Sequence, residues 1–382
     1  MKSFFGFDNV ATQVWMLVDH VRVSAYERAL TQLVRPGDVV ADIGTGTGIL
    51  ALLALRAGAR KVYAVERGTV AELAARVFQD NDPEGRIELL RTDARDVSFP
   101  ERPTIIVSET MGVFGIDEDM SQLFRILRPR CAPAVRFVPH RLRLFLAAAH
   151  EPGLAADFLS LENSYGLRLQ EVRKRAANQP ATRRVSAEDL LSSPARIAEL
   201  SLAYDELPKD HEVQLTIQRA GTLNTLAGWF EVDLTDEVGL TNSPLSAPTS
   251  WRHLVLPVDP PLEVEAGDIV NVEMIPRISG SGSLWQWTVS CNGAVRRGDS
   301  LRSTNGGVRE LAEQLGMEVL PAEHVLPSKE LQVLVALCGG NIECSIDEMA
   351  ARVMQALPSR FASEKDARDE VLRRLASLGA LG

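Results

Sequence analysis

The 382-residue sequence has few cysteines and no long apolar run. Its four cysteines, Cys131, Cys291, Cys338 and Cys344, form no Cys-x-x-Cys pair, which argues against structural zinc and against a disulfide framework. No apolar run approaches the roughly 18 residues that a membrane span requires, and no secretory signal opens the sequence. We therefore expect a soluble, cytoplasmic protein without a membrane partner.

Basic residues are outnumbered, with 41 lysines and arginines against 51 aspartates and glutamates and a net charge of -10. Non-specific binding to nucleic acid is therefore not expected, whereas a cationic substrate is compatible with this charge. The chain is too long for one ordinary core, so we expect two or three domains. The hydrophobic fraction of 45% is sufficient to fill their cores.

The most informative stretch, Val39–Leu50, predicts a strand, a tight turn and a helix. The turn follows Asp42 and contains Gly44, Thr45, Gly46 and Gly48. Glycine is needed where the backbone takes angles that a Cβ penalises and where the main chain approaches a ligand closely. The Gly-x-Gly-x-Gly spacing lacks the frame of dinucleotide binders, and the nearby carboxylate of Asp42 would repel a diphosphate. That carboxylate can accept hydrogen bonds from an ammonium group, which favours S-adenosylmethionine as the cofactor.

Strands and helices alternate after this turn. The predicted strands are 38–43, 61–66, 86–91 and 104–109, the helices between them are 48–57 and 69–79, and a largely helical segment, 4–34, comes first. This alternation predicts a parallel sheet with helices on both faces. Ligands then bind at the carboxyl ends of the strands.

Two further acidic residues follow predicted strands. Glu66 closes the second strand, 22 residues after Gly44, where a carboxylate would reach a ribose diol. Asp93 comes just after the third strand, where an adenine amino group would lie. A single acidic residue at a strand end is more often a cap, but two of them after one glycine-rich turn favour nucleoside binding.

The loop after the fourth strand carries two glutamates, Glu109 and Glu118, with Gly112 and Gly115 between them. The loop can therefore fold back and bring both carboxylates to the ligand edge. Two anions about 4 Å apart repel each other by roughly 4 kcal/mol at an effective dielectric of about 20, so we expect a cation beside them. A planar, forked guanidinium fits paired carboxylates best. The alternative is a solvated acidic loop, the usual fate of a run such as 117–119.

The alternating pattern stops after about residue 150. Segment 153–165 predicts a helix, and 171–180 predicts a polar, basic arm. Period-two runs then predict an antiparallel sandwich or barrel, with strands at 141–149, 212–218, 226–234, 251–257, 269–275 and 284–290 and turns at 245–248 and 259–262. Segment 293–307 predicts a linker, and the last helices are expected at 308–315, 328–338, 345–357 and 363–378.

Residues 1 to about 290 resemble the protein arginine methyltransferases. The motifs occur in the order found in that family: Met16-Leu17-Val18-Asp19 with Arg22 and Tyr26, residues 42–50, residues 62–66, Ser108-Glu109-x-Met111-Gly112 with Glu118, and Thr249-Ser250-Trp251 followed by Gly267-Asp268. The resemblance implies a Rossmann-like methyltransferase half, a β-barrel half with an inserted helical dimerisation arm, and a head-to-tail homodimer.

The resemblance also implies roles for particular residues. Glu109 and Glu118 would hold and orient the substrate guanidinium. Arg22 would bind the methionine carboxylate of the cofactor, and Glu66 would bind its ribose. Asp93 is assigned to the adenine from general methyltransferase geometry.

Five residues are expected in the substrate pocket: Met16, Asp19, Met120, Ser250 and Trp251. The two methionines match positions that leave room for asymmetric dimethylation in the family. Ser250 stands where most members have histidine, although the symmetrically dimethylating branch also has serine. Four further departures from the family pattern, at Ser3, Phe7, Thr110 and Val113, also lie in or near this pocket, so the sequence indicates the cofactor more firmly than the substrate.

The expected organisation has five parts. These are N-terminal helices that cover the cofactor (1–35), a Rossmann-like domain (36–140), a β-barrel domain (141–292) with an arm at about 151–185, a linker and helix (293–322), and a C-terminal helical, winged-helix-like module (323–382). The last module is weakly similar to PqqD-like peptide-binding domains.

The leading hypothesis is N-methylation of arginine in a protein or peptide. The alternative is methylation of another cationic nitrogen, such as a primary amine on a ribosomally made peptide, which the altered pocket and the extra module motivate. A third hypothesis is a non-catalytic binding or scaffold protein that keeps the cofactor fold.

Overall fold

The computed structural model describes residues 9–300, apart from 164–165, 168, 208–209 and 280–281, together with a few positions between 350 and 368. Contacts divide the chain into two units. The first comprises Met1–Ala156, Pro180–Ile275 and Trp287–Arg297, and the second comprises Asp157–Gln179, Pro276–Gln286 and Gly298–Gly382. The Rossmann-like and most of the antiparallel elements belong to the first unit.

The first unit begins with two helices, α1 (Val10–Leu17) and α2 (His20–Leu33). The predicted helical segment breaks between them because Asp19 is the N-cap of α2, where its side chain accepts a hydrogen bond from the backbone of Arg22. Tyr26 and Leu30 of α2 are fully buried. The helix is therefore packed against the core of the first unit.

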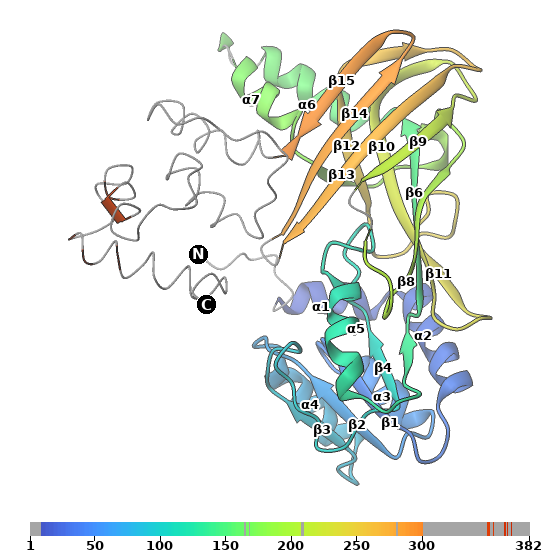
Figure 1. Cartoon of the computed structure of the whole chain (residues 1–382), viewed down its shortest axis with the longest axis vertical. Coiled ribbons are helices and arrows are strands. Elements are labelled where there is room, and N and C mark those ends of the chain that lie inside the picture. The colour runs from blue at the N-terminus through green and yellow to red at the C-terminus, as the bar shows by residue number, and fades with distance from the viewer. Residues whose placement is uncertain are drawn as a thin grey trace. The chain divides into compact units, whose positions relative to one another are not determined.

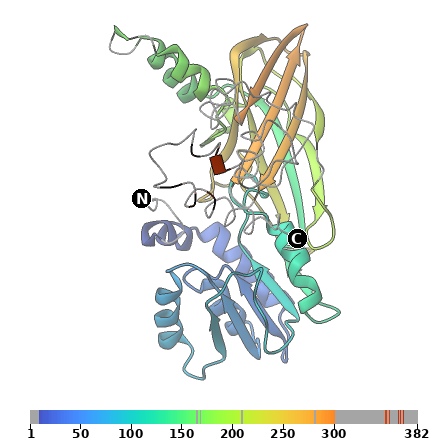
Figure 2. The same ribbon diagram turned by 60° about the vertical axis from the view of Figure 1, so that its left-hand side comes forward.

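A parallel sheet follows, with strands β1 (Val39–Ile43), β2 (Lys61–Val65), β3 (Ile87–Leu90), β4 (Ile105–Ser108) and β5 (Arg136–Val138) in the order β3-β2-β1-β4-β5. Its helices are α3 (Ile49–Arg56), α4 (Ala71–Asn81) and α5 (Met120–Leu127), with a 3₁₀ turn at Arg128–Arg130 (Figures 1 and 2). The strands predicted at 38–43, 61–66, 86–91 and 104–109 are confirmed. The strand order reverses between β1 and β4, which is where ligands bind in such sheets.

The antiparallel part contains two sheets. One has the order β7-β12-β10-β6-β8, with β11 beside β10, and the other has the order β15-β14-β13-β9. The bounds are β6 (Arg141–Ala149), β7 (Ala181–Arg183), β8 (Ala195–Ser201), β9 (His211–Thr216), β10 (Gly221–Asp233), β11 (Gly239–Thr241), β12 (His253–Val264), β13 (Ile269–Ser279), β14 (Gly282–Cys291) and β15 (Ala294–Asp299). The antiparallel half predicted from the period-two runs is confirmed, and β7, β8 and β11 are additional strands.

Two sequence predictions in this half are wrong. The turn expected at 259–262 lies inside β12, where the register with β10 shifts between the pairs Thr225–Pro257 and Leu223–Leu262. The extra residues of β12 form an irregularity that accommodates prolines without a ladder hydrogen bond. The linker expected from residue 293 begins with strand β15, because Asn292 and Gly293 both take positive φ and close a hairpin.

The predicted helical arm contains α6 (Pro152–Asn163) and α7 (Gln170–Ala176), so the helix expected at 153–165 is confirmed. The basic segment 171–180 begins as part of α7, where the guanidinium of Arg173 lies 5.4 Å from the ring centroid of Phe158. The helices predicted at 308–315 and 328–338 lie outside the described residues, as do almost all of those at 345–357 and 363–378. The domain boundaries and the PqqD-like module stay predictions. Among the described helices, none is both long and apolar enough for a membrane crossing.

Replacing Gly228 of β10 by alanine should destabilise the first unit. A Cβ at this position would lie 2.7 Å from the ring of Phe114, which is fully buried. Such overpacking costs about 1–3 kcal/mol, so the denaturation midpoint should fall. Gly239→Ala is the control, because its Cβ would lie 3.4 Å from its nearest neighbour, the carbonyl oxygen of Val232. An unchanged midpoint for Gly228→Ala would contradict this packing.

Candidate active site

The glycine-rich turn after β1 has the backbone that the sequence predicts. Gly44, Gly46 and Gly48 take φ values of 71°, 56° and 91°, a region that other residues rarely adopt. A Cβ on Gly48, which begins α3, would lie 2.3 Å from the ring of Phe78. Position 48 therefore requires glycine, both because its φ is positive and because a Cβ would overlap the ring of Phe78.

Asp42 joins β1 to the start of α3. Its buried carboxylate accepts hydrogen bonds from the Thr45 hydroxyl at 2.5 Å and from the Ala51 amide at 2.9 Å, both on Oδ2. Burial raises the pKa of Asp42 to about 7, although these two hydrogen bonds act in the opposite direction. Its Oδ1 atom is buried and has no hydrogen-bond partner within the described structure. A polar group of a ligand can therefore bind this oxygen.

Glu66 and Asp93 lie just beyond β2 and β3. Glu66 accepts hydrogen bonds from the amides of Gly46 at 3.1 Å and Gly68 at 2.6 Å, so it is tied directly to the glycine-rich turn. Asp93 accepts from the Arg95 amide and pairs with Arg67 at 2.8 Å. Burial opposes the charge of Asp93, but these interactions outweigh it and lower its pKa. Asp93 is therefore ionised near neutral pH, and both carboxylates are positioned beside the turn or its neighbouring strand end.

Glu109 follows β4 and is 13% exposed. Its carboxylate forms an ion pair with the guanidinium of Arg22 at 3.0 Å, and that guanidinium lies 5.6 Å from the ring centroid of Trp251. Burial raises the pKa of Glu109, whereas Arg22 lowers it. The residue that the family resemblance assigns to the cofactor carboxylate thus contacts one of the two predicted catalytic glutamates.

Glu118 is half-buried and close enough to Glu109 for their charges to interact. Burial, followed by the charges of Glu109 and Asp117, raises the pKa of Glu118 to about 8. A carboxyl group with this pKa is mostly protonated at pH 7. The fold-back of the loop predicted from Gly112 and Gly115, which both take positive φ, is thus consistent with the structure.

The residues predicted for the substrate pocket fall into two groups. Asp19 accepts a hydrogen bond from the Ser250 amide at 2.6 Å, and Trp251 packs edge-on against Phe230, so these residues adjoin Arg22 and Glu109. Met120, at the start of α5, is fully buried, and Met16 on α1 is half-buried.

Asn242 is a residue of this region that the sequence did not indicate. It is 3% exposed, its side-chain amide donates to the carbonyls of Val113 and Arg252, and its oxygen accepts from the Phe230 amide. Asn242 thereby connects the loop between the two glutamates to β10 and to the segment that carries Trp251. Asparagine follows β11 with no motif around it, so only the structure shows this role.

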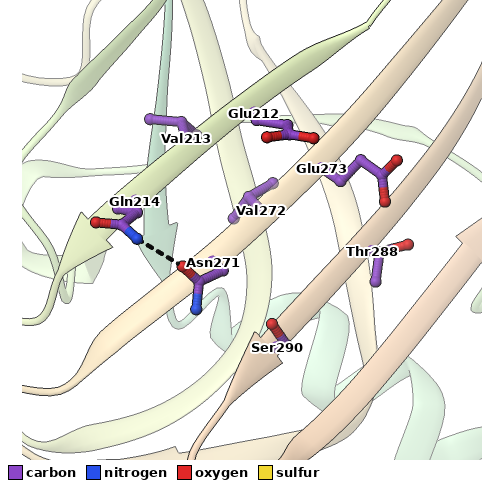
Figure 3. A pocket seen from close by; sticks show the side chains of 8 residues that line it. All are labelled: Glu212, Val213, Gln214, Asn271, Val272, Glu273, Thr288 and Ser290. Carbon is purple, nitrogen blue, oxygen red and sulfur yellow. Dashed lines mark hydrogen bonds between the residues drawn. The ribbon is translucent and has the colours of Figure 1, made fainter.

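A separate groove of about 420 Å³ lies on the face of β9, β13 and β14 (Figure 3). Its lining residues are Glu212, Val213, Gln214, Asn271, Val272, Glu273, Thr288 and Ser290. Glu212 and Glu273 are direct partners across β9 and β13 and are exposed, so water solvates both charges. The groove contains none of the residues predicted for catalysis or cofactor binding.

The fold and the region around the glycine-rich turn define a class of protein. The strand order, the turn at the β1–β4 reversal and the unpartnered oxygen of Asp42 fit an α/β methyltransferase that binds S-adenosylmethionine. Residues 24–109 match the family model of the ribosomal protein L11 methyltransferase (PrmA). Residues 140–279 match the model of the arginine methyltransferase oligomerization subdomain.

Two proteins of similar sequence and one of similar structure identify the family. Protein arginine N-methyltransferase 6 from Danio rerio is 30% identical over 300 residues, which cover 74% of this chain and 84% of that protein. PRMT10 from Oryza sativa subsp. japonica is 30% identical over 310 residues, covering 70% and 81%. The Trypanosoma brucei PRMT1 enzyme–prozyme heterotetrameric complex with AdoHcy is similar in structure, with a TM-score of 0.72, 25% identity and coverage of 77% of this chain and 99% of that one. The chain belongs to the protein arginine N-methyltransferase family.

Family membership confirms several predictions. The chain is an S-adenosylmethionine-dependent protein methyltransferase with a Rossmann-like half and an antiparallel half, as the sequence indicated.

Replacing Asn242 by alanine should destabilise the first unit and loosen the loop between the glutamates. The change leaves two carbonyls and one amide without their buried partner. The expected loss is about 2–4 kcal/mol of unfolding free energy, measured by chemical denaturation. Asn271→Ala, at an exposed position, is the control and should change stability by less than about 0.5 kcal/mol. Equal stability of the two variants would contradict the bridging role of Asn242.

Proposed function

We propose that this protein transfers a methyl group from S-adenosylmethionine to an arginine guanidinium of a protein or peptide substrate. The observation that carries the proposal is the nearly buried carboxylate of Glu109 after β4, which already binds one guanidinium, that of Arg22, at 3.0 Å. Glu118 lies on the same loop, and the charge of Glu109 helps to raise its pKa. Relatives named as protein arginine N-methyltransferases support the same acceptor.

The residues that would hold the cofactor surround the glycine-rich turn. Asp42 offers its unpartnered oxygen, Gly44, Thr45, Gly46 and Gly48 offer close backbone approach, and Glu66 and Asp93 would face the nucleoside. When bound, the cofactor supplies an electrophilic methyl group on a sulfonium. Arg22 has further N–H groups besides the one that contacts Glu109, so it could also bind the cofactor carboxylate.

The two glutamates would orient the guanidinium and bias its charge. A guanidinium stays protonated at any physiological pH, and its lone pairs are delocalised. Carboxylates on the non-reacting nitrogens concentrate positive charge there, so the remaining nitrogen becomes more nucleophilic. Met16, Asp19, Met120, Ser250 and Trp251 would shape the pocket around this nitrogen. The half-buried indole of Trp251 could exclude water from one side.

Glu109→Gln should remove turnover and leave cofactor binding intact. The amide keeps the shape of the side chain but loses the charge that orients the guanidinium, so kcat should fall at least about 100-fold. Turnover is measured by mass spectrometry of an arginine peptide, and cofactor affinity is measured by calorimetry. Glu212→Gln, on the exposed face of β9, is the matched control and should retain full activity.

Three results would contradict the proposal. Turnover of Glu109→Gln equal to that of the wild type would show that the carboxylate has no catalytic role. Methylation of amine-terminated peptides in place of arginine peptides would identify the primary amine as the acceptor. Absence of cofactor binding by the wild type would identify a non-catalytic protein.

We further propose that the protein forms a homodimer through α1 and the helical arm. Val10, Val14, Val18 and Val21 follow each other at steps of four, four and three residues, and each is at least 43% exposed. Val10, Val14 and Val18 form an apolar stripe along one side of α1 and its C-cap, and Val21 is exposed on α2. The arm also exposes apolar side chains, at Leu159, Leu167 and Val172. The match of residues 140–279, which include the arm, to an oligomerization subdomain supports a second copy as the partner that covers the arm.

The double change Val14→Asp and Val18→Asp should convert a dimer into a monomer, because two charges in an apolar interface are left without partners. Light scattering after gel filtration should show about half the mass of the wild type. Val295→Asp, which places the same charge at an exposed position of β15, should leave the mass unchanged. A wild type that is already monomeric would refute the dimer.

A further inference from the structure

The loop between Glu109 and Glu118 contains a third carboxylate, Asp117, whose side chain turns inward. Its oxygen Oδ2 accepts a hydrogen bond from the amide of Phe114 at 2.7 Å. Hydrogen bonding to the backbone of Val113 and of Asp117 itself also lowers the pKa of this carboxyl group, against the larger effect of burial. Asp117 therefore does not belong to a solvated acidic run, and the sequence-based alternative for this segment is wrong at this residue.

The loop is built to receive this side chain. Gly112 takes a φ of 61°, and a Cβ there would lie 2.6 Å from the Cβ of Asp117 and 2.7 Å from its Oδ2. The backbone of Gly112 also lowers the pKa of Glu118 by hydrogen bonding, against the larger effect of burial. The backbone of residues 112–114 thus turns toward two successive carboxylates, Asp117 and Glu118.

In this geometry the position of Glu118 depends on Asp117, the residue before it. Asp117 is fixed by the Phe114 amide at 2.7 Å and by its close packing against Gly112, whereas Glu118 follows it directly in the chain. We propose that Asp117 is a positioning residue. Its carboxylate accepts a hydrogen bond from the loop backbone, which folds the loop back and so holds Glu118 beside Glu109. The inference rests on the proposed function, because it concerns the carboxylate pair that would bind the substrate cation.

The charged groups that act on Glu118 are Glu109, Asp117 and Arg67, of which the first two raise its pKa and the last lowers it. Burial raises the pKa of Asp117 to about 6, so Asp117 is ionised at pH 7 and above. The pKa of Glu118 is about 8 in the free protein. A cation that requires ionised Glu118 must displace its proton below pH 8, so binding strengthens as the pH rises through 8.

Removing the charge of Asp117 removes one cause of the raised pKa of Glu118. The rise in substrate binding should then move to lower pH, which a purely structural role of Asp117 would not produce. Removing its oxygens as well leaves the Phe114 amide without its acceptor, so the loop should lose its fixed conformation at every pH.

The experiment compares wild type, Asp117→Asn and Asp117→Ala by the pH dependence of kcat/KM for a cationic peptide. For the wild type, kcat/KM should rise about tenfold between pH 7 and pH 9, as expected for a group with a pKa of about 8. For Asp117→Asn, kcat/KM should rise less between pH 7 and pH 9, because a lower pKa of Glu118 places part of the rise below pH 7. Asp117→Ala should lower kcat/KM about tenfold or more at pH 9, with cofactor affinity by calorimetry unchanged.

Asp119→Asn is the matched control. This carboxylate is two residues away, faces Arg95 and Arg125, and takes a positive φ that asparagine tolerates. The control should keep the wild-type profile.

The possible outcomes separate the inference from the proposed function. Profiles and rates of both Asp117 variants equal to those of the wild type would overturn the inference while arginine methylation stands. Loss of cofactor binding in Asp117→Asn would also overturn it, because the effect would then extend beyond the loop. If the wild type methylates only amine peptides, the proposed acceptor is wrong, and the same profiles measured with the amine peptide still test Asp117.

Discussion

The ion pair between Arg22 and Glu109 connects the parts of the first unit on which the site depends. Arg22 comes from α2, Glu109 follows β4, and the same guanidinium lies over Trp251 from the antiparallel half. Both side chains are nearly buried, with exposures of 7% and 13%, so removing either partner would leave an uncompensated charge. Asp19 reinforces the connection, because its carboxylate caps α2 and also accepts from the Ser250 amide. The N-terminal helix, the sheet edge and the aromatic segment are therefore held together by a few charged groups.

The surrounding carboxylates are tolerated because each has specific donors. Asp42 is held by Thr45 and Ala51, Glu66 by two glycine amides, and Asp117 by the amide of Phe114 in its own loop. Most of these donors are backbone groups, whose positions the fold determines. Acidic side chains can therefore gather at one edge of the sheet, and the glycines that allow the backbone to turn toward the acids are as important as the acids.

The sequence predicted those features that have a local physical cause. The turn at Gly44–Gly48 requires positive φ, the strands around it are continuous apolar runs, and Glu109 and Glu118 are separated by glycines that let the loop return. Features that depend on contacts distant in sequence were not predictable in this way. Asn242 joins residues more than a hundred positions apart, and Arg22 forms its ion pair with Glu109, which is also distant in the sequence. Strand β15 is an intermediate case, because the Asn292-Gly293 pair is a hairpin signal that the arginine- and serine-rich composition obscured.

The charge state of the free site bears on which nitrogen it would accept. Glu109 is neutralised by Arg22, and Glu118 is mostly protonated at pH 7, so the pair carries little net charge before a substrate arrives. A compact ammonium could replace the proton on Glu118, but it has no planar arrangement of donors to reach a second carboxylate at the same time. A guanidinium has five N–H groups in one plane and can contact Glu118 and Glu109 together while a third nitrogen stays free. The entering cation would then exchange with the proton of Glu118, so a proton leaves the site at binding, before any methyl group is transferred.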